Sequence, residues 1–403
     1  MALLLEARDR NSRARAGLLS TAHGDVRTPA FVPLATKATV KGLLAEEVAA
    51  LGYDMVLGNT FHLMLNPGHE LIQSLGGLHR FMGWERPIIT DSGGFQVFSM
   101  GHGTIAEEIK SRGRHGDSVS RAGAIISIAE EGVRFRSYVD GREQWLTPEG
   151  SMAVQAALGS DIALVFDECT PFHVERDYTA RSTERTHRWL DRCLDWHTRN
   201  GPAGQLVYGI VQGGVHEDLR RASAQTVAAT ACDGIAIGGS LGAEKAQMYE
   251  VVSYAVDELS AEREPRPTHL LGIGEVDDLI ACVRLGIDTF DCAMPTRLGR
   301  HGTALVPDPE NRWRVDLTKG RWRDVDGPLI DGCPCPACSR GLSRAYLSYL
   351  ARANELTGMR LLTAHNLAFI ARLMSDLRGG ILRGELDVAA RALLNGATPG
   401  CVL

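Results

Sequence analysis

The stretch Ile162-Ala163-Leu164-Val165-Phe166-Asp167 consists of five apolar residues followed by an aspartate. Short apolar runs that end in a polar residue are typical of strands buried on both faces of a parallel sheet. The chain contains eight runs of this kind, and segments with a helical spacing of apolar residues separate them. The other seven runs are 31–35, 55–59, 87–91, 206–212, 234–238, 269–273 and 287–291. This alternation predicts an α/β protein with a (β/α)8 TIM barrel, and a doubly wound open sheet is the alternative.

The composition is that of an ordinary globular protein. The 403 residues are 44% hydrophobic and 23% charged, which suits one large domain, 1–403, with a smaller attached part. No run of 18 or more apolar residues occurs, so we expect no transmembrane helix. Charges directly follow the short apolar run at the N-terminus, unlike in a signal peptide. The nine cysteines are odd in number and unevenly spread, which favours a reducing, cytoplasmic location.

Three regions interrupt the alternation of strands and helices. Residues 1–30 have the short alternating segments of a small antiparallel sheet. Residues 101–150 form an insertion, in which 133–138 and 143–146 flank an Asp140-Gly141 pair that predicts a β-hairpin. After the eighth run, 343–357 is predicted to be a helix closed by Gly358, and 367–377 is predicted to be another.

The densest cluster of metal-binding side chains is Cys333-Pro334-Cys335-Pro336-Ala337-Cys338, with His365 further along the chain. Three thiols and one imidazole are a standard ligand set for a closed, tetrahedral structural zinc site. Free buried cysteines are the alternative interpretation, but packing alone does not concentrate thiols this densely. The pattern predicts a zinc-binding subdomain at about 300–370.

Polar residues end several of the predicted strands, where the catalytic groups of a (β/α)8 barrel lie. They are Asn59, Asp91, Asp167, Gln212, the Gly238-Gly239 pair and Asp291. Each aspartate alone could be a helix N-cap, but three on one rim favour a functional site. Two carboxylates that face one substrate are what glycosyl chemistry requires, so the residues indicate glycosyl transfer or hydrolysis.

Positive charge is concentrated locally, although the net charge of −6 argues weakly against nucleic acid as a partner. One basic run follows the eighth strand, and a second lies in the insertion. Their members are Arg297, Arg300, Arg312, Arg314, Lys319, Arg321 and Arg323, and then Lys110, Arg112, Arg114, His115 and Arg121. Each run could be a solvated face or a surface that binds phosphate.

Taken together, the motifs of this chain resemble those of the tRNA-guanine transglycosylases, and within them the bacterial type. The residues that carry the resemblance are Gly58-Asn59-Thr60-Phe61-His62-Leu63, Thr90-Asp91-Ser92-Gly93-Gly94-Phe95-Gln96, Phe166-Asp167-Glu168-Cys169-Thr170-Pro171, Gly209-Ile210-Val211-Gln212-Gly213, Phe290-Asp291-Cys292 with Pro295-Thr296-Arg297, and the Cys₃His set. The resemblance extends over nearly the whole chain. It implies a (β/α)8 barrel with a zinc subdomain, usually a homodimer. It also implies a pentosyltransferase that exchanges guanine at the wobble position of certain tRNA anticodons for a 7-deazaguanine, in queuosine biosynthesis.

The resemblance also implies roles for individual residues. Asp291 corresponds to the nucleophile that attacks the anomeric carbon of the ribose, and Asp91 corresponds to the general acid and base. The base would contact Asp167, Gln212, Gly239, the Ser240 carbonyl, Cys169 and Ser92, between Phe95 and Leu271 as a sandwich. The anticodon loop would be held by Arg297, Arg300 and Thr296. One structural zinc ion would be bound by Cys333, Cys335, Cys338 and His365.

Three alternatives remain open at this stage. Cys169 and Glu244 match the pattern for 7-aminomethyl-7-deazaguanine, but a family member that prefers queuine is the alternative. A sugar hydrolase on the same barrel is disfavoured by the cysteine knuckle and by the basic stretch after Asp291. A non-catalytic tRNA-binding partner subunit would lack the catalytic aspartates, whereas this chain has both.

Overall fold

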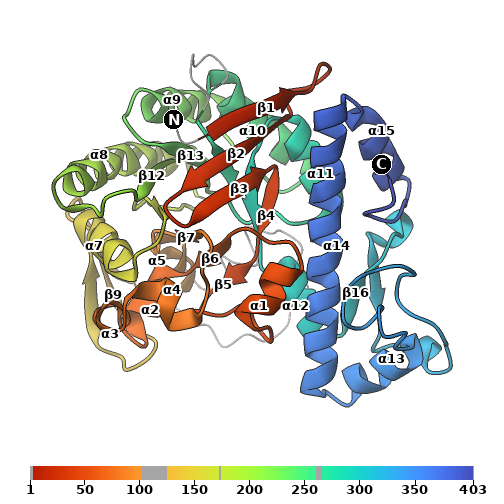
Figure 1. Ribbon diagram of the computed structural model, residues 1–403. Helices are drawn as coiled ribbons and strands as arrows, with labels where there is room; N and C mark the ends of the chain where they lie inside the picture. The colour runs from red at the N-terminus through yellow and green to blue at the C-terminus, as the bar shows by residue number, and fades with distance from the viewer. Residues whose placement is uncertain (1–2, 102–124, 172–173, 260–265, 403) are drawn as a thin grey trace.

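A barrel of parallel strands forms the centre of the computed structural model, which describes residues 3–101, 125–171, 174–259 and 266–402 (Figure 1). The strand order is β4-β15-β14-β13-β12-β11-β7-β6-β5, and all of the paired neighbours are parallel. The strands are β4 (Ala30–Val32), β5 (Leu34–Ala35), β6 (Val56–Gly58), β7 (Ile88–Thr90), β11 (Ile162–Leu164), β12 (Leu206–Val211), β13 (Gly234–Ile237), β14 (Thr268–Leu270) and β15 (Thr289–Asp291). Each overlaps one of the eight apolar runs, so the predicted barrel is confirmed and the open-sheet alternative is wrong.

The barrel closes at Pro33, which separates β4 from β5. Phe31 of β4 lies opposite Phe290 of β15, whereas Leu34 of β5 lies opposite Leu57 of β6. Proline has no N–H to donate, but the Pro33 carbonyl accepts a hydrogen bond from the Leu57 N–H at 3.0 Å. One stretch of chain therefore pairs with both ends of the sheet, which leaves no open edge.

A three-stranded antiparallel sheet covers the amino-terminal mouth of the barrel, as predicted for residues 1–30. Its strands are β1 (Leu3–Arg8), β2 (Arg15–Thr21) and β3 (Gly24–Thr28), and they lie in front of the barrel in Figure 1. Arg15 Nε is 2.8 Å from a carboxylate oxygen of Asp288, directly before β15. Arg27 Nε is 2.8 Å from Asp54, shortly before β6. Since these partners precede barrel strands, the sheet is bound to the end opposite the strand-end aspartates.

A buried carboxylate, Asp161, also links this sheet to the barrel. It accepts hydrogen bonds from the N–H groups of His23 (3.0 Å) and Ile88 (2.8 Å) and from the rings of His23 (2.7 Å) and His79 (3.1 Å). Burial raises the pKa of Asp161, but these hydrogen bonds outweigh burial and lower the pKa to about 2. The two rings stack with centroids 3.6 Å and planes 18° apart, so their in-plane lone pairs do not meet at one metal ion. The group is therefore a hydrogen-bonded link.

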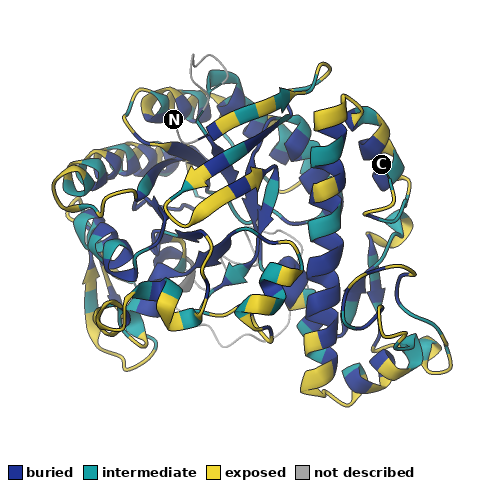
Figure 2. Ribbon diagram, viewed as in Figure 1, coloured by how far each residue is buried: buried dark blue, intermediate teal, exposed yellow. Residues whose placement is uncertain are grey.

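Helices surround the barrel and turn their buried faces toward the strands (Figure 2). Among the described residues, no helix combines the length and the apolar character that crossing a bilayer requires. The helices up to the end of the barrel are α1 (Ala45–Ala50), α2 (Thr60–Leu65), α3 (His69–Ser74), α4 (Gly77–Met82), α5 (Gly94–Gly101), α7 (Pro148–Leu158), α8 (Arg176–Asn200), α9 (Glu217–Ala228), α10 (Lys245–Leu259) and α11 (Val276–Arg284).

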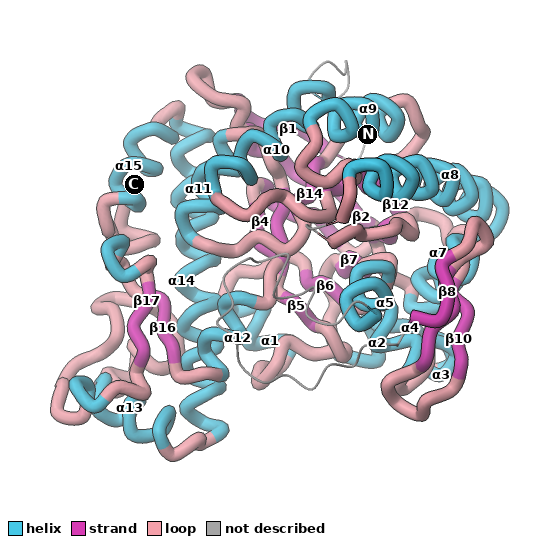
Figure 3. Tube along the Cα trace, turned by 180° about the vertical axis from the view of Figure 1, so that it is seen from behind, coloured by secondary structure: helices cyan, strands magenta, loops and turns pink. Residues whose placement is uncertain are grey.

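An additional antiparallel sheet lies between β7 and β11. It contains β8 (Ile125–Ile128), β9 (Val133–Arg136) and β10 (Glu143–Leu146), and it stands beside α7 at the edge of the molecule (Figure 3). Gly141 lies in the turn between β9 and β10 with φ +75°, a conformation that glycine adopts without strain. The basic run at 110–121 lies outside the described residues.

The chain after β15 packs against the barrel through α14 (Leu356–Arg383), the long helix that runs along its side in Figures 1 and 3. Asn366 of α14 is fully buried, and its side-chain amide donates to the carbonyls of Pro295 and Thr303 at 3.0 Å each and accepts from the Leu305 N–H at 2.7 Å. The other elements here are α12 (Met294–Arg300), β16 (Thr303–Leu305), η1 (Pro309–Asn311), β17 (Arg314–Asp316), η2 (Gly320–Trp322), α13 (Arg344–Arg352) and α15 (Leu386–Leu394).

The helix boundaries predicted for 343–357 and 367–377 are wrong. Helix α13 ends at Arg352, and α14 begins at Leu356 and continues through both Gly358 and His365. A Cβ at Gly358 would lie 2.7 Å from the Leu350 Cβ. Glycine is therefore present because α14 approaches α13 closely, and not because a helix ends there.

We predict that Asp161 makes stability depend on acid pH. The pKa of Asp161 is about 2 in the folded chain, below the ordinary 3.8, so its stabilisation is complete above about pH 4 and is lost as the pH falls toward 2. Urea unfolding between pH 5 and pH 2 measures this. Replacing Asp161 with Asn should lower the free energy of unfolding at pH 7 by about 1–3 kcal/mol and should flatten the acid slope. Equal slopes for both proteins would contradict the assignment.

Candidate functional site

A cavity of about 480 Å³ lies at the carboxyl-terminal mouth of the barrel. The loops that follow β5, β6, β7, β11, β13, β14 and β15 all contribute to its wall. Among the residues that the sequence singled out, those lining the cavity are Asn59, Asp91, Ser92, Phe95, Asp167, Cys169, Gly239, Leu271, Asp291 and Arg297. The fold therefore brings the strand-end aspartates to one cavity, although they come from strands far apart in the sequence.

Asp91 follows β7 and lies in a net of hydrogen-bond donors. The Thr60 N–H donates to one carboxylate oxygen at 2.9 Å, and the side-chain amides of Gln96 (3.1 Å) and Asn59 donate to the other. Desolvation is the largest influence and raises the pKa of Asp91 to about 7, with a further rise from the negative charge of Asp291. The hydrogen bonds to the carboxylate lower the pKa of Asp91, but by less than burial raises it. A carboxyl group with a pKa near 7 can both donate and accept a proton at neutral pH.

Asp291 is the last residue of β15 and faces the same cavity. Its Oδ1 lies 3.1 Å from His269 Nε2 and 3.2 Å from the Gly272 backbone nitrogen. His269 belongs to β14 (Thr268–Leu270), and Gly272 lies in the turn that follows this strand. The arrangement holds this carboxylate firmly on the wall, close enough to Asp91 for the two charges to interact.

Asp167 lies shortly after β11, the strand that pairs directly with β7, and its carboxylate is bonded to neutral donors. The Ser92 hydroxyl donates to one oxygen at 2.9 Å, and the Gln212 amide donates to the other at 2.6 Å. Burial raises the pKa of Asp167 to about 6, so the group is mainly ionised at pH 7. Burial also raises the pKa of the Cys169 thiol far above its usual range, which makes a thiolate at this position unfavourable. A carboxylate acceptor beside donors of this kind suits the N–H edge of a heterocyclic base.

Gln212 and Ser240 lie behind the cavity wall, whereas Gly239 lies on it. A Cβ at Gly239 would lie 2.2 Å from the Gln212 amide oxygen, and φ there is +77°, so only glycine suits the position. The Ser240 carbonyl accepts a hydrogen bond from Arg220 at 2.9 Å. The Ser240 carbonyl is therefore hydrogen-bonded to a buried side chain in the structure.

Arg220 of α9 is fully buried behind the cavity. Its guanidinium also donates to the carbonyls of Gly214 (2.7 Å) and Val211 (3.0 Å), and it takes part in none of the ion pairs found among the described residues. Burial lowers its pKa to about 10, so Arg220 remains a cation at neutral pH. A buried cation bound by carbonyls ties the loop after β12 to the loop after β13, on the side where Asp167 lies.

The rim of the cavity carries several cations. Arg297 lines the cavity, and Arg300 follows it on α12, with its Nε bonded to the Thr296 carbonyl at 3.2 Å. The Thr296 side chain is buried, and its hydroxyl bonds the Ala293 carbonyl of its own helix. Burial lowers the pKa of Lys41, and the positive charges of Arg300 and Lys37 lower it further. This crowding of like charges indicates a surface that attracts phosphate.

The sequence interpretation missed four residues at this site: Lys37, Lys41, Arg220 and His269. Lys37 and Lys41 directly follow the first predicted strand, so their position at the catalytic end of the barrel was a signal that could have found them. Arg220 gave no local signal, because its burial depends on contacts between loops. His269 opens an apolar run, and a histidine inside a buried strand was also a usable signal.

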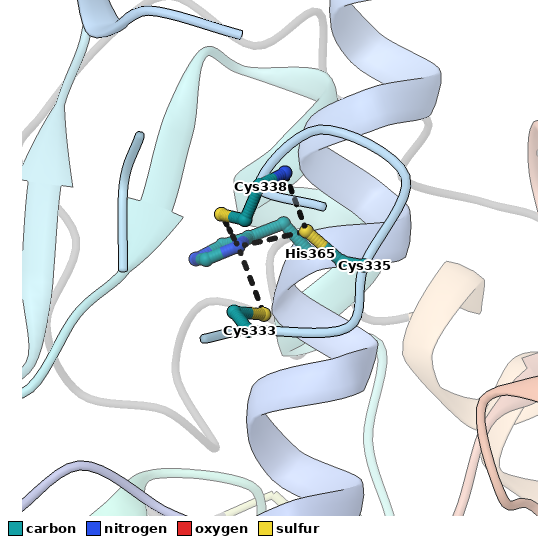
Figure 4. Close-up of side chains that lie close together, drawn as sticks. All are labelled: Cys333, Cys335, Cys338 and His365. Atoms are coloured by element: carbon teal, nitrogen blue, oxygen red, sulfur yellow. Dashed lines mark hydrogen bonds between the residues drawn. The ribbon is translucent and has the colours of Figure 1, made fainter. Parts of the chain in front are cut away.

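The Cys₃His group is assembled as the sequence predicts (Figure 4). His365 Nδ1 lies 3.8, 3.3 and 3.5 Å from the sulfurs of Cys333, Cys335 and Cys338. A tetrahedral ion with metal–sulfur bonds of about 2.3 Å and a metal–nitrogen bond of about 2.1 Å requires about 3.6 Å between nitrogen and sulfur. The other ring nitrogen, Nε2, donates to the Leu305 carbonyl at 2.8 Å, so Nδ1 is free to be a ligand. These residues could hold a metal ion.

Comparison with known proteins gives one consistent result. A family model described as queuine tRNA-ribosyltransferase matches residues 9–398. A queuine tRNA-ribosyltransferase from Roseiflexus sp. (strain RS-1) is 50% identical over 394 residues, which cover 96% of this chain and 97% of that protein. Proteins of the same name from Pelotomaculum thermopropionicum and Psychrobacter cryohalolentis are 46% and 43% identical, and the matches cover 92–94% of each chain.

We predict that Asp91 titrates near pH 7 in the folded protein. Carbon-13 NMR of labelled aspartate carboxyl groups should show one signal with a midpoint of about 7 that is missing in Asp91→Asn. In Asp291→Asn the midpoint should fall, because the neighbouring negative charge raises the pKa of Asp91 in the wild type. If no Asp91-dependent signal changes between about pH 6 and pH 8, the burial argument for Asp91 is wrong.

Proposed function

The chain belongs to the queuine tRNA-ribosyltransferase family, and from this premise we propose that it exchanges guanine at the wobble position of tRNA anticodons for a 7-deazaguanine. The base that we propose is 7-aminomethyl-7-deazaguanine, as a step of queuosine biosynthesis. The reaction replaces one N-glycosidic bond by another, so it is a pentosyl transfer.

One observation carries this proposal: Asp91 and Asp291 face the same cavity. The pKa of Asp91, about 7, suits a group that must give and take a proton within one catalytic cycle. Asp291 is held on the cavity wall through one of its two oxygens, which suits a nucleophile.

The proposed mechanism has two displacements. In the first, an Asp291 oxygen bonds to the ribose anomeric carbon, the bond from that carbon to guanine breaks, and Asp91 donates a proton to the departing base. In the second, the incoming deazaguanine loses a proton to Asp91, bonds to the same carbon and displaces Asp291. Both carboxyl groups then return to their starting states, so protons and bonds balance over the cycle.

Base recognition uses the part of the cavity around Asp167. Asp167, ionised at pH 7, would accept hydrogen bonds from the N–H edge of the base, with Ser92 and Gln212 holding the carboxylate. The Gly239 backbone and Cys169 would border the ring, together with Ser240 through the loop that Arg220 holds. Phe95, 38% exposed, and Leu271 would sandwich the ring.

The cationic rim would hold the RNA. Arg297 and Arg300, with Thr296 as part of their helix, are the proposed contacts to the anticodon loop, and we add Lys37 and Lys41 on the facing loop. The target base must leave its stack to enter a cavity of this depth, as it does in other enzymes that act on bases.

The metal at the Cys₃His group is proposed to be one zinc ion per chain with a structural role. Four protein ligands complete a tetrahedron, so no position is left for a reacting water. In this proposal residues 300–370 form a zinc-binding subdomain on a single barrel domain, with 101–150 as an insertion.

We also propose a homodimer, for which the exposed side chains of Tyr349 and Leu356 near this subdomain offer apolar surface.

Queuine as the preferred base is the alternative substrate. Competition between 7-aminomethyl-7-deazaguanine and queuine for one tRNA preparation decides between them. A non-catalytic partner subunit is disfavoured because both aspartates are present and aligned on one cavity.

We predict that Asp291→Asn abolishes the covalent RNA adduct and lowers base exchange at least about 1,000-fold, since the amide is not a nucleophile. Incorporation of labelled guanine into tRNA measures exchange, and denaturing electrophoresis measures the adduct. A hydrolase would release guanine and incorporate no label. An adduct that persists in Asp291→Asn would reject this nucleophile.

Metal removal should damage folding and tRNA docking before chemistry. We expect Cys335→Ser to lose the metal, to unfold at a lower temperature and to bind tRNA more weakly, while the exposed Cys401→Ser retains one zinc per chain and serves as the control. Metal analysis, thermal unfolding and tRNA binding are the measurements. A metal-free, folded protein that binds tRNA normally but loses only the chemical step would show that the metal is catalytic.

A further inference from the structure

A fully buried histidine, His269, lies directly behind Asp291. Both of its ring nitrogens have partners: Nε2 is 3.1 Å from Asp291 Oδ1, and Nδ1 is 2.9 Å from the Thr289 hydroxyl oxygen. A carboxylate only accepts hydrogen bonds, so Nε2 carries the proton when Asp291 is ionised. In the neutral ring Nδ1 is then an acceptor, and the Thr289 hydroxyl donates to it. The partners alone therefore determine the tautomer.

The barrel register makes this arrangement rigid. His269 of β14 and Thr289 of β15 are direct partners in the parallel pair. Thr289 and Asp291 are two residues apart on one strand, so their side chains point to the same face. All three side chains are buried or nearly so. A chain of two hydrogen bonds thus runs from Thr289 through His269 to Asp291, inside the barrel and away from the solvent.

The two oxygens of Asp291 are not equivalent. Oδ1 accepts from His269 Nε2 and also from the Gly272 N–H at 3.2 Å. Within residues 3–101, 125–171, 174–259 and 266–402, the hydrogen bonds to the Asp291 carboxylate all go to Oδ1 and none goes to Oδ2. Since Asp291 lines the cavity, its unbonded oxygen is the one available to a substrate.

We propose that His269 is a positioning residue for Asp291: its Nε2–H and the Gly272 N–H hold Oδ1, so that Oδ2 is presented to the ribose carbon. This inference rests on the proposed function, because it assumes that Asp291 attacks. An imidazole suits this task. It fixes the direction of the carboxylate with one hydrogen bond, whereas a lysine or arginine would form an ion pair that competes with attack on carbon.

A matched pair of variants tests the proposal. In His269→Gln the amide nitrogen can occupy the place of Nε2 and donate to Asp291. In His269→Asn the shorter side chain reaches only the place of Nδ1. We expect His269→Asn to lower the single-turnover rate of guanine release from tRNA about 10–100-fold, the range for losing one hydrogen bond to a charged group. His269→Gln should recover to within about fivefold of the wild type by keeping that hydrogen bond.

Two further measurements separate positioning from general damage. The KM for the incoming base should stay within about twofold in both variants, because the base-binding groups around Asp167 do not contact His269. Thr289→Val, which removes the outer hydrogen bond, should have a smaller effect of about threefold. Thr268→Val changes a buried neighbour on the other face of β14 and is the control for loosening of the strand.

The outcomes are distinguishable. Equal rates in His269→Gln and His269→Asn, whether both fast or both slow, would overturn the positioning role. So would a loss that appears only as a raised KM for the base. If the wild-type chain itself forms no adduct and incorporates no labelled guanine, the proposed function fails, independently of the variants. If the adduct forms in the wild type and the Gln variant is faster than the Asn variant, the inference stands.

Discussion

Closure of the barrel by its first strand brings the two catalytic-site aspartates, Asp91 and Asp291, to the same mouth. Pro33 divides that strand, so one half pairs with β15 and the other half pairs with β6. This pairing places the end of β15, with Asp291, near the end of β7, with Asp91. In an open sheet the two strands would lie near opposite edges, and no cavity would contain both carboxylates. Closure also leaves two mouths, and the amino-terminal sheet covers one of them.

Desolvation at the other mouth then determines the chemistry. Three carboxylates surround one cavity, and their environments differ. Desolvation and a neighbouring charge raise the pKa of Asp91 to about 7, whereas Asp167, among neutral donors, reaches about 6. Groups with similar chemistry but different pKa values can take different roles in one reaction. Arg220, a buried cation behind the wall, holds the loops after β12 and β13 together by their carbonyls.

The Cys₃His group acts on the site through α14. His365 lies in the middle of this helix and is fixed from behind by the Leu305 carbonyl. Two residues before His365, α14 contacts α12 so closely that a Cβ at Gly299 would lie 2.6 Å from the Thr363 nitrogen. Arg297 and Arg300 are on α12, so the metal-binding group, the long helix and the cationic rim form one connected unit. This connection explains how a group outside the cavity can matter for a large substrate.

The sequence alone was enough to predict the eight strands, the sheet at residues 1–30, the Cys₃His residues that could hold a metal ion, and the strand-end aspartates that line the cavity. Each of these follows from local patterns: apolar runs, turn residues and ligand spacing. The ends of α13 and α14 depend on tertiary contacts. Gly358 is required by the close approach of α14 to Leu350 of α13, and it does not mark the end of a helix. The tertiary structure likewise decided the burial of Arg220 and the hydrogen-bonded line from Thr289 to Asp291. Burial and side-chain pairing join residues distant in sequence, and the free energy of such contacts has no signature in a local pattern.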